Sequence, residues 1–357
     1  MKSKLKALIL SGGKGTRLRP FTYTGAKQLV PIANKPILFY ALEDLVSCGI
    51  TDIAIVVGDT KDEVMATVGD GSRFGAAVSY IDQLVPLGIA HGIQIGREFL
   101  GASPFILYLG DNFLQEGIQP YVQAFLEGRY HCQVLLCPVE NPQDFGVAEL
   151  DGGRLVRVVE KPREPPSDLA VIGIYMFDSH VFEAVDAIRP SARGELEITD
   201  TIQYLIDKGL NVHADVVRGR WIDTGKHDDL LAANRAILES LKRNIAGNAQ
   251  GSTLRGQVVL QEGSQVVDSI VDGPAIIGER TRVLGSYIGP FTSIYHDCLI
   301  SDSEISGSVV LENTQIETLG HRIEHSLIGR NVELRGTNRR PRSYNLVLGD
   351  FSKVRVP

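Results

Sequence analysis

The last third of the sequence carries a short apolar repeat that restricts its fold more than any other feature does. Branched apolar residues recur at roughly hexad spacing between residues 254 and 334, in the segments 258–260, 266–267, 270–271, 276–278, 287–289, 309–310 and 327–329. One turn of such a repeat cannot bury its apolar face alone, so successive turns must stack on each other. The repeat predicts a left-handed parallel β-helix of about four coils. An irregular sandwich of short strands is the alternative.

The first two thirds of the chain alternate short apolar runs with amphipathic patterns. Apolar runs predict strands at 5–10, 52–58, 78–81, 105–109, 133–138 and 171–177. Helical spacing of apolar residues predicts helices at 36–48 and 228–243. This alternation predicts an α/β fold, a Rossmann-like and mostly parallel sheet with helices on both faces.

A polar segment at 247–252 follows the last of these helices and marks a change in composition. We therefore expect two domains, residues 1–245 and residues 246–357. A chain of 357 residues is long enough for both, because single domains usually contain about 100 to 200 residues.

The charge balance and the cysteines narrow the possible partners and the compartment. The chain has 36 basic and 43 acidic residues, and its net charge of −7 would repel nucleic acid. Its four cysteines form no C-x-x-C pair, which is typical of reduced thiols. No apolar run approaches the roughly 18 residues of a membrane-spanning helix, and no secretion signal is visible. We expect a cytoplasmic protein that binds neither nucleic acid nor a membrane.

A glycine-rich loop, SGGKGTRL at residues 11–18, directly follows the first predicted strand. Glycines let the backbone approach a phosphate and present several N–H donors to it, and Lys14 and Arg17 add positive charge. The loop lacks the Gly-Lys-Ser/Thr ending of a Walker A motif, and Leu18 replaces the last glycine of the G-x-G-x-x-G fingerprint. The pattern predicts a phosphate-binding loop of another kind.

Motifs that follow one another from residue 8 to residue 225 resemble those of the sugar-1-phosphate nucleotidylyltransferase family. The loop of this family has the form G-G-x-G-T-R-L, which stands here at 12–18. The other matching segments are KQLVP (27–31), NKP (34–36), Gln83 with PLGIA (86–90), LGDN (109–112), FGV (145–147), EKP (160–162), GIY (173–175), RGELEITD (193–200) and WIDTG (221–225). Within the family, the chain is most similar to the long-form glucose-1-phosphate thymidylyltransferases, whose fold also ends in a β-helix.

The resemblance implies a fold of the nucleotide-diphospho-sugar transferase type and a Mg²⁺-dependent reaction. A nucleotidyl group would pass from dTTP to glucose 1-phosphate, which gives dTDP-glucose and pyrophosphate. Such a transfer depends mainly on positioning anions and neutralising their charge. The resemblance assigns a shared Mg²⁺ to Asp111 and Asp223. It assigns the leaving pyrophosphate to Arg17, the triphosphate to Lys27 and the incoming sugar phosphate to Lys161, and these five residues are the expected catalytic set.

The resemblance also implies the residues that bind the substrates. The amide of Gln83 can both donate to and accept from a pyrimidine edge. His91, close by, is interpreted as a packing or surface histidine. The residues expected to bind the nucleotide are Leu10, Gly12, Gly13, Gly15, Thr16, Arg17, Gln83 and Gly88. The residues expected to bind the sugar phosphate are Asn112, Gly146, Glu160, Lys161, Val171, Tyr175 and Arg193.

Three alternatives stay open. Phe145 stands where the family usually has tyrosine, and His91 differs from the commoner residue beside the base-reading segment, so UTP or another sugar 1-phosphate could be used. A hexapeptide β-helix is also the fold of many acyltransferases, and a second active site could draw on His296, His321 and His325. The family also contains inactive regulatory subunits, against which the retained catalytic residues argue. We expect a homo-oligomer in which the β-helix packs subunits together.

Overall fold

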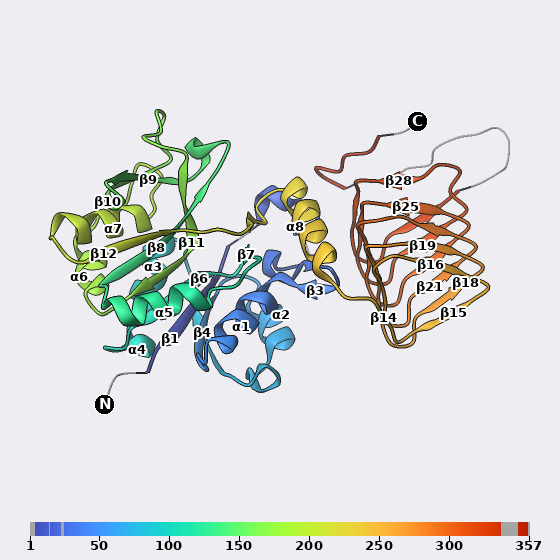
Figure 1. Ribbon diagram of the computed structural model, residues 1–357, viewed down its shortest axis with the longest axis horizontal. Coiled ribbons are helices and arrows are strands. Elements are labelled where there is room, and N and C mark those ends of the chain that lie inside the picture. Colours follow the sequence, from blue (N-terminus) through green and yellow to red (C-terminus); the bar gives the residue numbers. More distant parts are fainter. Residues whose placement is uncertain (1–3, 14, 23–24, 337–348, 356–357) are drawn as a thin grey trace. The chain divides into compact units, whose positions relative to one another are not determined.

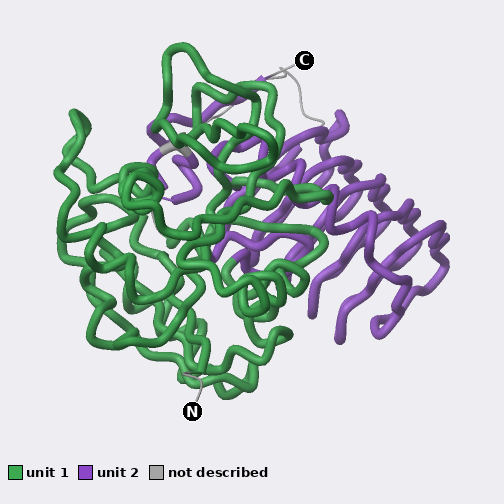
Figure 2. Tube along the Cα trace, turned by 60° about the vertical axis from the view of Figure 1, so that its left-hand side comes forward, with its two compact units in different colours: residues 1–14, 25–28, 38–223 green, residues 15–24, 29–37, 224–357 purple. Residues whose placement is uncertain are grey.

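The computed structural model describes residues 4–13, 15–22, 25–336 and 349–355 (Figure 1). The chain divides into two compact units, which Figure 2 shows in different colours. The first unit comprises residues 1–14, 25–28 and 38–223, and the second comprises residues 15–24, 29–37 and 224–357. The domain limits predicted at residues 245 and 246 stay a prediction.

A mixed sheet forms the first unit, and among the described residues it has nine strands. Its order is β10-β9-β11-β6-β1-β4-β5, and β8 pairs with both β11 and β12. The strands are β1 (Lys6–Ser11), β4 (Asp52–Val57), β5 (Ala77–Asp82), β6 (Phe105–Leu109), β8 (Cys132–Pro138), β9 (Gly146–Asp151), β10 (Arg154–Glu160), β11 (Leu169–Phe177) and β12 (Val212–Val216). Strands β5, β4, β1 and β6 run parallel, whereas β11 runs antiparallel to β6 and β8. The predicted Rossmann-like sheet is confirmed, and β11 is an antiparallel strand within it.

Helices cover both faces of this sheet, as predicted. Leu107 on β6 packs in one core cluster with Ala90 on α3 and Ile202 on α7. The next residue along β6 points to the opposite face, where the Tyr108 hydroxyl donates to Asp44 on α1 at 3.2 Å. The helices of this unit are α1 (Ile37–Ser47), α2 (Lys61–Val68), α3 (Ile89–Ile95), α4 (Arg97–Leu100), α5 (Gln119–Gly128), α6 (Val181–Ala187) and α7 (Ile198–Asp207). In the part of the chain that the structure describes, no helix is long and apolar enough to cross a membrane.

Three parallel sheets, coloured orange to red in Figure 1, form a β-helix in the second unit. The first sheet contains β14 (Asn244–Ile245), β17 (Val258–Leu260), β20 (Ala275–Ile277), β23 (Thr292–Ile294), β26 (Val309–Val310) and β29 (Leu327–Ile328). The second contains β15 (Asn248–Gln250), β18 (Gln265–Val267), β21 (Arg282–Leu284), β24 (Leu299–Ser301), β27 (Gln315–Glu317) and β30 (Glu333–Arg335). The third contains β16 (Thr253–Arg255), β19 (Ile270–Asp272), β22 (Tyr287–Ile288), β25 (Glu304–Ser306) and β28 (Ile323–Glu324). The parallel β-helix is confirmed, the irregular sandwich is wrong, and the left-handedness of the coil stays a prediction.

Like residues stack on each other from one coil to the next. Val266, Val283 and Ile300 occupy the same register position in successive strands and are fully buried. At one corner of the coil, the N–H of Ser286 donates to Ser269 Oγ at 3.0 Å, and the same contact recurs between neighbouring coils. Each buried hydroxyl therefore satisfies a backbone donor of the following coil.

The β-helix begins earlier than the apolar repeat does. Within the described residues, two of its sheets have six strands and the third has five, which is more than the roughly four predicted coils. Its first strands, β14 and β15, are exposed and mostly polar. A terminal coil stacks on one neighbour only, so it does not need the full apolar pattern.

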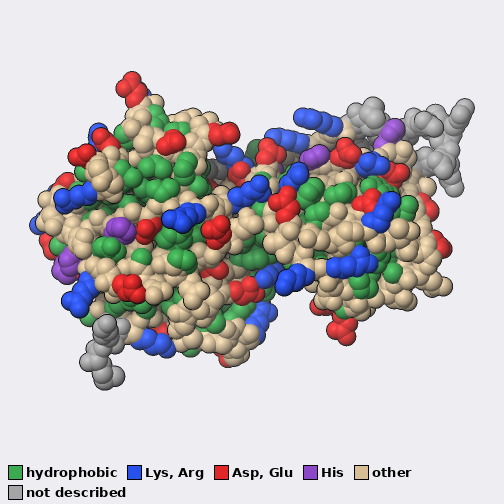
Figure 3. Space-filling model, in the orientation of Figure 1, with side chains coloured by type: hydrophobic (Ala, Val, Ile, Leu, Met, Phe, Trp, Pro, Cys, Tyr) green, Lys and Arg blue, Asp and Glu red, His purple; other side chains and the backbone are tan. Residues whose placement is uncertain are grey.

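Charged side chains of both signs are interspersed on the face of the molecule shown in Figure 3. In the β-helix, charged pairs join successive coils. Arg255 Nε donates to Asp272 Oδ1 at 2.6 Å, and Arg280 Nε donates to Asp297 Oδ1 at 2.7 Å. Both pairs are 17 residues apart, the length of one coil. Helix α8 (His227–Ser240) and the hairpin of β2 (Pro31–Ile32) and β3 (Lys35–Pro36) belong to the same unit.

Candidate active site

Two carboxylates from distant parts of the chain meet beside the carboxyl end of β6. Asp111 stands shortly after β6, and Asp223 ends the short strand β13 (Trp221–Asp223). Strand β13 pairs antiparallel with β7 (Asn112–Leu114), which places Asp223 opposite Asn112 and therefore next to Asp111. The carboxyl end of the parallel strands is the edge at which open α/β sheets bind their ligands.

The ammonium group of Lys27 contacts both of these carboxylates. Lys27 begins a short 3₁₀ helix (Lys27–Leu29) and is 9% exposed. Its Nζ donates to Asp111 Oδ2 and lies 3.8 Å from Asp223 Oδ1. Burial by itself would raise the pKa of Asp111, but the charge of Lys27 and the hydrogen bonds from Lys27 and Asn112 outweigh it and lower this pKa. Asp111 is therefore ionised at neutral pH.

Asn112 fixes the position of Asp111. Asn112 is 2% exposed, and its Nδ2 donates to Asp111 Oδ1 at 3.0 Å. Its Oδ1 accepts Trp221 Nε1–H at 2.6 Å and the N–H of Gly173 at 3.3 Å. The resemblance implied a contact of Asn112 with the sugar phosphate and no role for Trp221. The sequence held one signal that could have pointed to Trp221, because this only tryptophan of the chain stands two residues before Asp223.

A second charged cluster lies at the end of β10, around Glu160. Arg193 Nη1 donates to Glu160 Oε1 at 3.0 Å, and Thr199 Oγ1 donates to Glu160 Oε2 at 3.3 Å. Lys161 Nζ lies 3.9 Å from Glu160 Oε1, and Gly146 is the strand partner of Glu160 across β9 and β10. The structure therefore brings together Gly146, Glu160, Lys161 and Arg193 of the expected sugar-phosphate residues.

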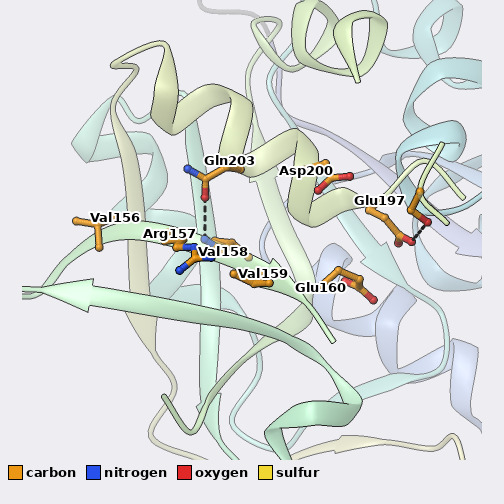
Figure 4. A pocket seen from close by; sticks show the side chains of 9 residues that line it. Val156, Arg157, Val158, Val159, Glu160, Glu197, Asp200 and Gln203 are labelled. Atoms are coloured by element: carbon orange, nitrogen blue, oxygen red, sulfur yellow. Dashed lines mark hydrogen bonds between the residues drawn. The ribbon is translucent and has the colours of Figure 1, made fainter. Parts of the chain in front are cut away.

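A pocket of about 460 Å³ lies beside this cluster, and the carboxylates of Glu160, Glu197 and Asp200 are among the groups that line it (Figure 4). Burial raises the pKa of Glu197, which accepts the Ser191 hydroxyl at 2.7 Å, and burial also raises the pKa of Asp200. Sequence reasoning matched Glu197 and Asp200 only as letters of the RGELEITD motif. The high proportion of acidic residues in that motif could have indicated that Glu197 and Asp200 lie at the site.

The glycine-rich loop and the base-reading segment also lie together. Gln83 follows β5, and a Cβ added at Gly12 would come within 2.7 Å of its Oε1. Gln83 Nε2 lies 3.0 Å from His91 Nδ1, and burial lowers the pKa of His91, so the ring is neutral at pH 7. His91 thus holds the amide of Gln83, a contact that the sequence did not reveal because it joins the end of a strand to a helix.

Gly88 links the base-reading segment to the RGELEITD motif. Its φ is +102°, and an added Cβ would lie 2.5 Å from the carbonyl oxygen of Leu196. The N–H of Leu196 donates to the carbonyl of Leu87 at 2.7 Å. The segment expected to read the base is therefore fixed to the motif that carries Arg193.

Three of the expected binding residues turn their side chains into the core. Val171 and Tyr175 lie on β11 and are 7% and 3% exposed. Burial, followed by the charge of Glu160, raises the pKa of Tyr175. Leu10 packs against the core cluster that contains α3. The backbone of Val171 is therefore the part of this residue that can contact a ligand, whereas the side chain of Leu10 is only half-buried.

The rest of the glycine-rich loop is described in part. Gly13 is exposed. Gly15 and Thr16 fall in the second unit, and Thr16 begins a 3₁₀ helix (Thr16–Leu18). Lys14 and the side chain of Arg17 lie outside the described residues. The role expected of Arg17 in binding pyrophosphate stays a prediction.

These groups supply what transfer of a nucleotidyl group requires. Two carboxylates offer hard oxygen atoms to a divalent cation, and Lys27 offers a buried positive charge to a phosphate. A backbone loop can approach phosphate oxygens, and the amide of Gln83 can pair with a base. The second cluster adds cations and hydroxyl acceptors for a sugar phosphate. The arrangement is that of a site for two phosphorylated substrates.

Comparison with known proteins agrees with this geometry. The profile of the nucleotidyl transferase family matches residues 6–240. A glucose-1-phosphate thymidylyltransferase of Streptomyces griseus is 51% identical over 354 residues, and one of Streptomyces antibioticus is 50% identical over 355 residues; each match covers 99% of both chains. A solved structure of a putative glucose-1-phosphate thymidylyltransferase from Bacillus anthracis, in complex with a sucrose, has a TM-score of 0.63 and 37% identity, and the match covers 68% of this chain and 98% of that one. The chain therefore belongs to the nucleotidyl transferase family, as a long-form sugar-1-phosphate nucleotidyltransferase.

Proposed function

We propose that this chain transfers a thymidylyl group from dTTP to glucose 1-phosphate, which forms dTDP-glucose and releases pyrophosphate. The observation that carries the proposal is the contact of the Lys27 ammonium with Asp111 and Asp223 at the carboxyl end of the sheet. Identity of 51% over 99% of the chain with a glucose-1-phosphate thymidylyltransferase supports the choice of both substrates.

In this reaction a phosphate oxygen of glucose 1-phosphate forms a bond with the α-phosphorus of dTTP. The bond between the α-phosphorus and the oxygen that bridges to the β-phosphate breaks, and pyrophosphate leaves with that oxygen. The attacking oxygen is already ionised at neutral pH, so the protein needs no general base. Its task is to hold two anions in line and to neutralise their charge.

Each cluster of the site has a part in this task. Lys27 binds the triphosphate near the α-phosphorus, and Arg17 binds the departing pyrophosphate. Lys161 and Arg193 bind the phosphate of the sugar, while Glu160 accepts hydrogen bonds from sugar hydroxyls. Beside them, Glu197 and Asp200 line the adjoining pocket with further acceptors.

The nucleotide is held by its base and by its phosphates. Gln83 pairs with the pyrimidine edge, held by His91, and the backbone of Gly88 makes the second base contact. The glycines at 12 and 13 let backbone N–H groups reach the phosphates. These contacts fix the α-phosphorus before the sugar phosphate attacks.

The carboxylates of Asp111 and Asp223 fit Mg²⁺. Both are hard oxygen ligands, Asp111 directly before β7 and Asp223 at the end of the neighbouring strand β13, and the structure places a positive group, the Lys27 ammonium, against both of them. A Mg²⁺ bound there would neutralise charge on the phosphates of the two substrates. Asn112 keeps Asp111 in place for this role by donating to its Oδ1.

The β-helix belongs to the proposal as an assembly element. It packs subunits of a homo-oligomer together, and the catalytic residues all precede it in the sequence. His296 Nδ1 lies 2.6 Å from Asp297, which is also paired with Arg280, and the proposal assigns no second active site to this histidine.

A panel of nucleoside triphosphates against several hexose 1-phosphates, with pyrophosphate release as the readout, tests the proposal. We expect the highest kcat/KM for dTTP with glucose 1-phosphate. UTP lacks one methyl group, which is worth about 1–3 kcal/mol, so we expect its kcat/KM to be about 10 to 200 times lower. If none of the substrate pairs releases pyrophosphate, the proposed activity is overturned. A higher kcat/KM for UTP would overturn the choice of dTTP alone.

A further inference from the structure

A cluster of two histidines and one aspartate lies outside the nucleotide site. His131 precedes β8, Asp178 follows β11, and His180 precedes α6. His131 Nδ1 lies 2.8 Å from Asp178 Oδ2, and His180 Nδ1 lies 3.0 Å from each oxygen of Asp178. One ligand atom from each residue lies within 4.8 Å of the other two. The proposed nucleotidyl transfer uses none of these residues.

Backbone contacts hold the three residues in place. Phe177 and Cys132, the neighbours of the cluster, pair across β11 and β8. The N–H of Asp178 donates to the carbonyl of His131 at 3.1 Å, so the pairing continues one step beyond the strands. Asp178 Oδ1 accepts the N–H of His180 at 3.0 Å, which fixes the turn that leads into α6. The three side chains therefore start from a rigid frame.

The cluster lies at the opposite edge of the sheet from the carboxylates of the active site. Phe177, next to Asp178, pairs with Phe105, the first residue of β6. Asp111 stands beyond the last residue of the same strand. At about 3.3 Å per residue, the five residues of β6 alone separate the two sites by roughly 16 Å. An ion bound at one site would not share ligands with the other.

The donor atoms suit a transition-metal ion better than Mg²⁺. Two imidazole nitrogens and one carboxylate oxygen are common ligands of Zn²⁺, whereas Mg²⁺ prefers oxygen alone. Donors on one tetrahedral Zn²⁺ stand about 3.3 Å apart, since Zn–N and Zn–O distances are about 2.0–2.1 Å. Asp178 Oδ2 lies 2.8 Å from His131 Nδ1 and 3.0 Å from His180 Nδ1, which is close to this value, and the ligand atoms of the two histidines lie within 4.8 Å of each other.

Solvent can reach the cluster. The side chains of His131, Asp178 and His180 are 30%, 27% and 47% exposed. An ion can therefore enter without local unfolding, and water can complete its coordination. Three protein donors would leave one position of a tetrahedral ion open to water.

We propose that His131, Asp178 and His180 bind Zn²⁺ or a similar transition-metal ion. Each histidine gives Nδ1 and the aspartate gives one carboxylate oxygen. The ion joins the beginning of β8 to the segment between β11 and α6. Because the unfolded chain does not hold these three residues together, the ion stabilises the folded protein.

Metal titration of the full chain, with any affinity tag removed, tests the proposal. Excess Mg²⁺ is present throughout to occupy the active-site carboxylates, and a chromophoric chelator competes for Zn²⁺. The variants are His131→Ala and His180→Ala. The matched control is His213→Ala, because His213 stacks on Tyr130 next to the cluster but lies outside it. Co²⁺ is added in place of Zn²⁺ in a parallel series to record its visible absorption.

We expect the wild type and His213→Ala each to bind one equivalent of Zn²⁺. The two cluster variants should bind Zn²⁺ at this site at least about tenfold more weakly. The intense visible absorption of tetrahedral Co²⁺ should follow the same pattern. Zn²⁺ should raise the Tm of the wild type and not that of the cluster variants. With Mg²⁺ and no Zn²⁺, pyrophosphate release by folded cluster variants should stay within about twofold of the wild type, since the site lies at the other edge of the sheet.

Equal Zn²⁺ binding by the wild type and by His180→Ala would overturn the proposal, and so would Co²⁺ absorption that is unaffected in this variant. In either case the three side chains form a hydrogen-bonded trio only. His131→Ala removes a ring that contacts His180, with 4.4 Å between the ring centroids. If this variant does not fold, His180→Ala decides the question alone, because its side chain is the more exposed one.

Discussion

The side-chain carbonyl of Asn234 accepts the backbone N–H of Ala33 at 2.9 Å. The same oxygen accepts the hydroxyl of Ser293, and Asn234 Nδ2 donates to the carbonyl of Phe291 at 3.1 Å. One buried amide on α8 therefore joins the β2–β3 hairpin to a coil of the β-helix. Lys27 stands shortly before this hairpin in the chain. The β-helix thus anchors the segment that follows a residue of the candidate active site.

Removal of this amide should destabilise the protein. Asn234 is only 1% exposed. Asn234→Ala therefore leaves the N–H of Ala33 and the carbonyl of Phe291 without their hydrogen-bond partner in the interior of the protein. A buried polar group without a partner costs about 1–3 kcal/mol, so we expect the free energy of unfolding to fall by at least that amount. Urea unfolding measures it. Glu239→Ala, on the exposed side of α8, is the control and should change the free energy by about 0.5 kcal/mol or less. Equal midpoints for the two variants would contradict the anchoring role.

The two carboxylates next to Lys27 should be indispensable for turnover. Asp111→Asn or Asp223→Asn keeps the size of the side chain but removes a charge that the proposed Mg²⁺ would require. We expect kcat for pyrophosphate release to drop by at least about a hundredfold in each variant, with an unchanged circular dichroism spectrum. Asp186→Asn, in an exposed ion pair with Arg97, is the matched control and should keep normal turnover. Near-normal activity of either active-site variant would refute the assignment.

Gly12→Ala should act through Gln83. The new Cβ would lie 2.7 Å from Gln83 Oε1, so the amide must move away from the position in which His91 holds it. We expect KM for the nucleotide to rise by about tenfold or more, which corresponds to about 1.4 kcal/mol. Steady-state kinetics with a fixed sugar phosphate measures this. Gly320→Ala is the control, because nothing lies within 4 Å of a Cβ there. A normal KM in Gly12→Ala would show that Gln83 does not bind the base from its present position.

The sequence predicted those features that depend on periodicity. Val266 and Val283 recur at the same place in successive coils, so the β-helix was visible as a repeat. Its first coil escaped notice because residues such as Asn248 need no apolar side chain at the end of a stack. The antiparallel direction of β11 was not predictable either. An apolar run such as 169–177 records burial but not the direction of the neighbouring strands.

The sequence predicted which residues belong to the candidate site, but it predicted few of the contacts between them. The motifs named Asp111 and Asp223, but only the pairing of β13 with β7 brings them together. Contacts such as Trp221 with Asn112 join residues 109 positions apart and leave no local signal. Sequence motifs therefore indicated which groups are expected to meet the substrates, whereas the residues that hold those groups required the structure.

The buried thiols should be unreactive in the folded protein. All four cysteines are free, and Cys132 and Cys298 are buried. Burial raises the pKa of Cys298 to about 11 and raises that of Cys132 well above its ordinary value. At pH 8 both are therefore neutral thiols, and the thiolate that reacts with iodoacetamide becomes common only as the pH rises towards the shifted pKa.

Alkylation followed by mass spectrometry checks this site by site. In the native protein at pH 8 we expect modification of the half-buried Cys48 and Cys137 before any modification of Cys132 and Cys298. In guanidinium chloride all four should react at similar rates, because unfolding removes the burial that raises each pKa. Alkylation of Cys298 in the folded protein as fast as in the unfolded chain would mean that the interior of the β-helix opens to solvent.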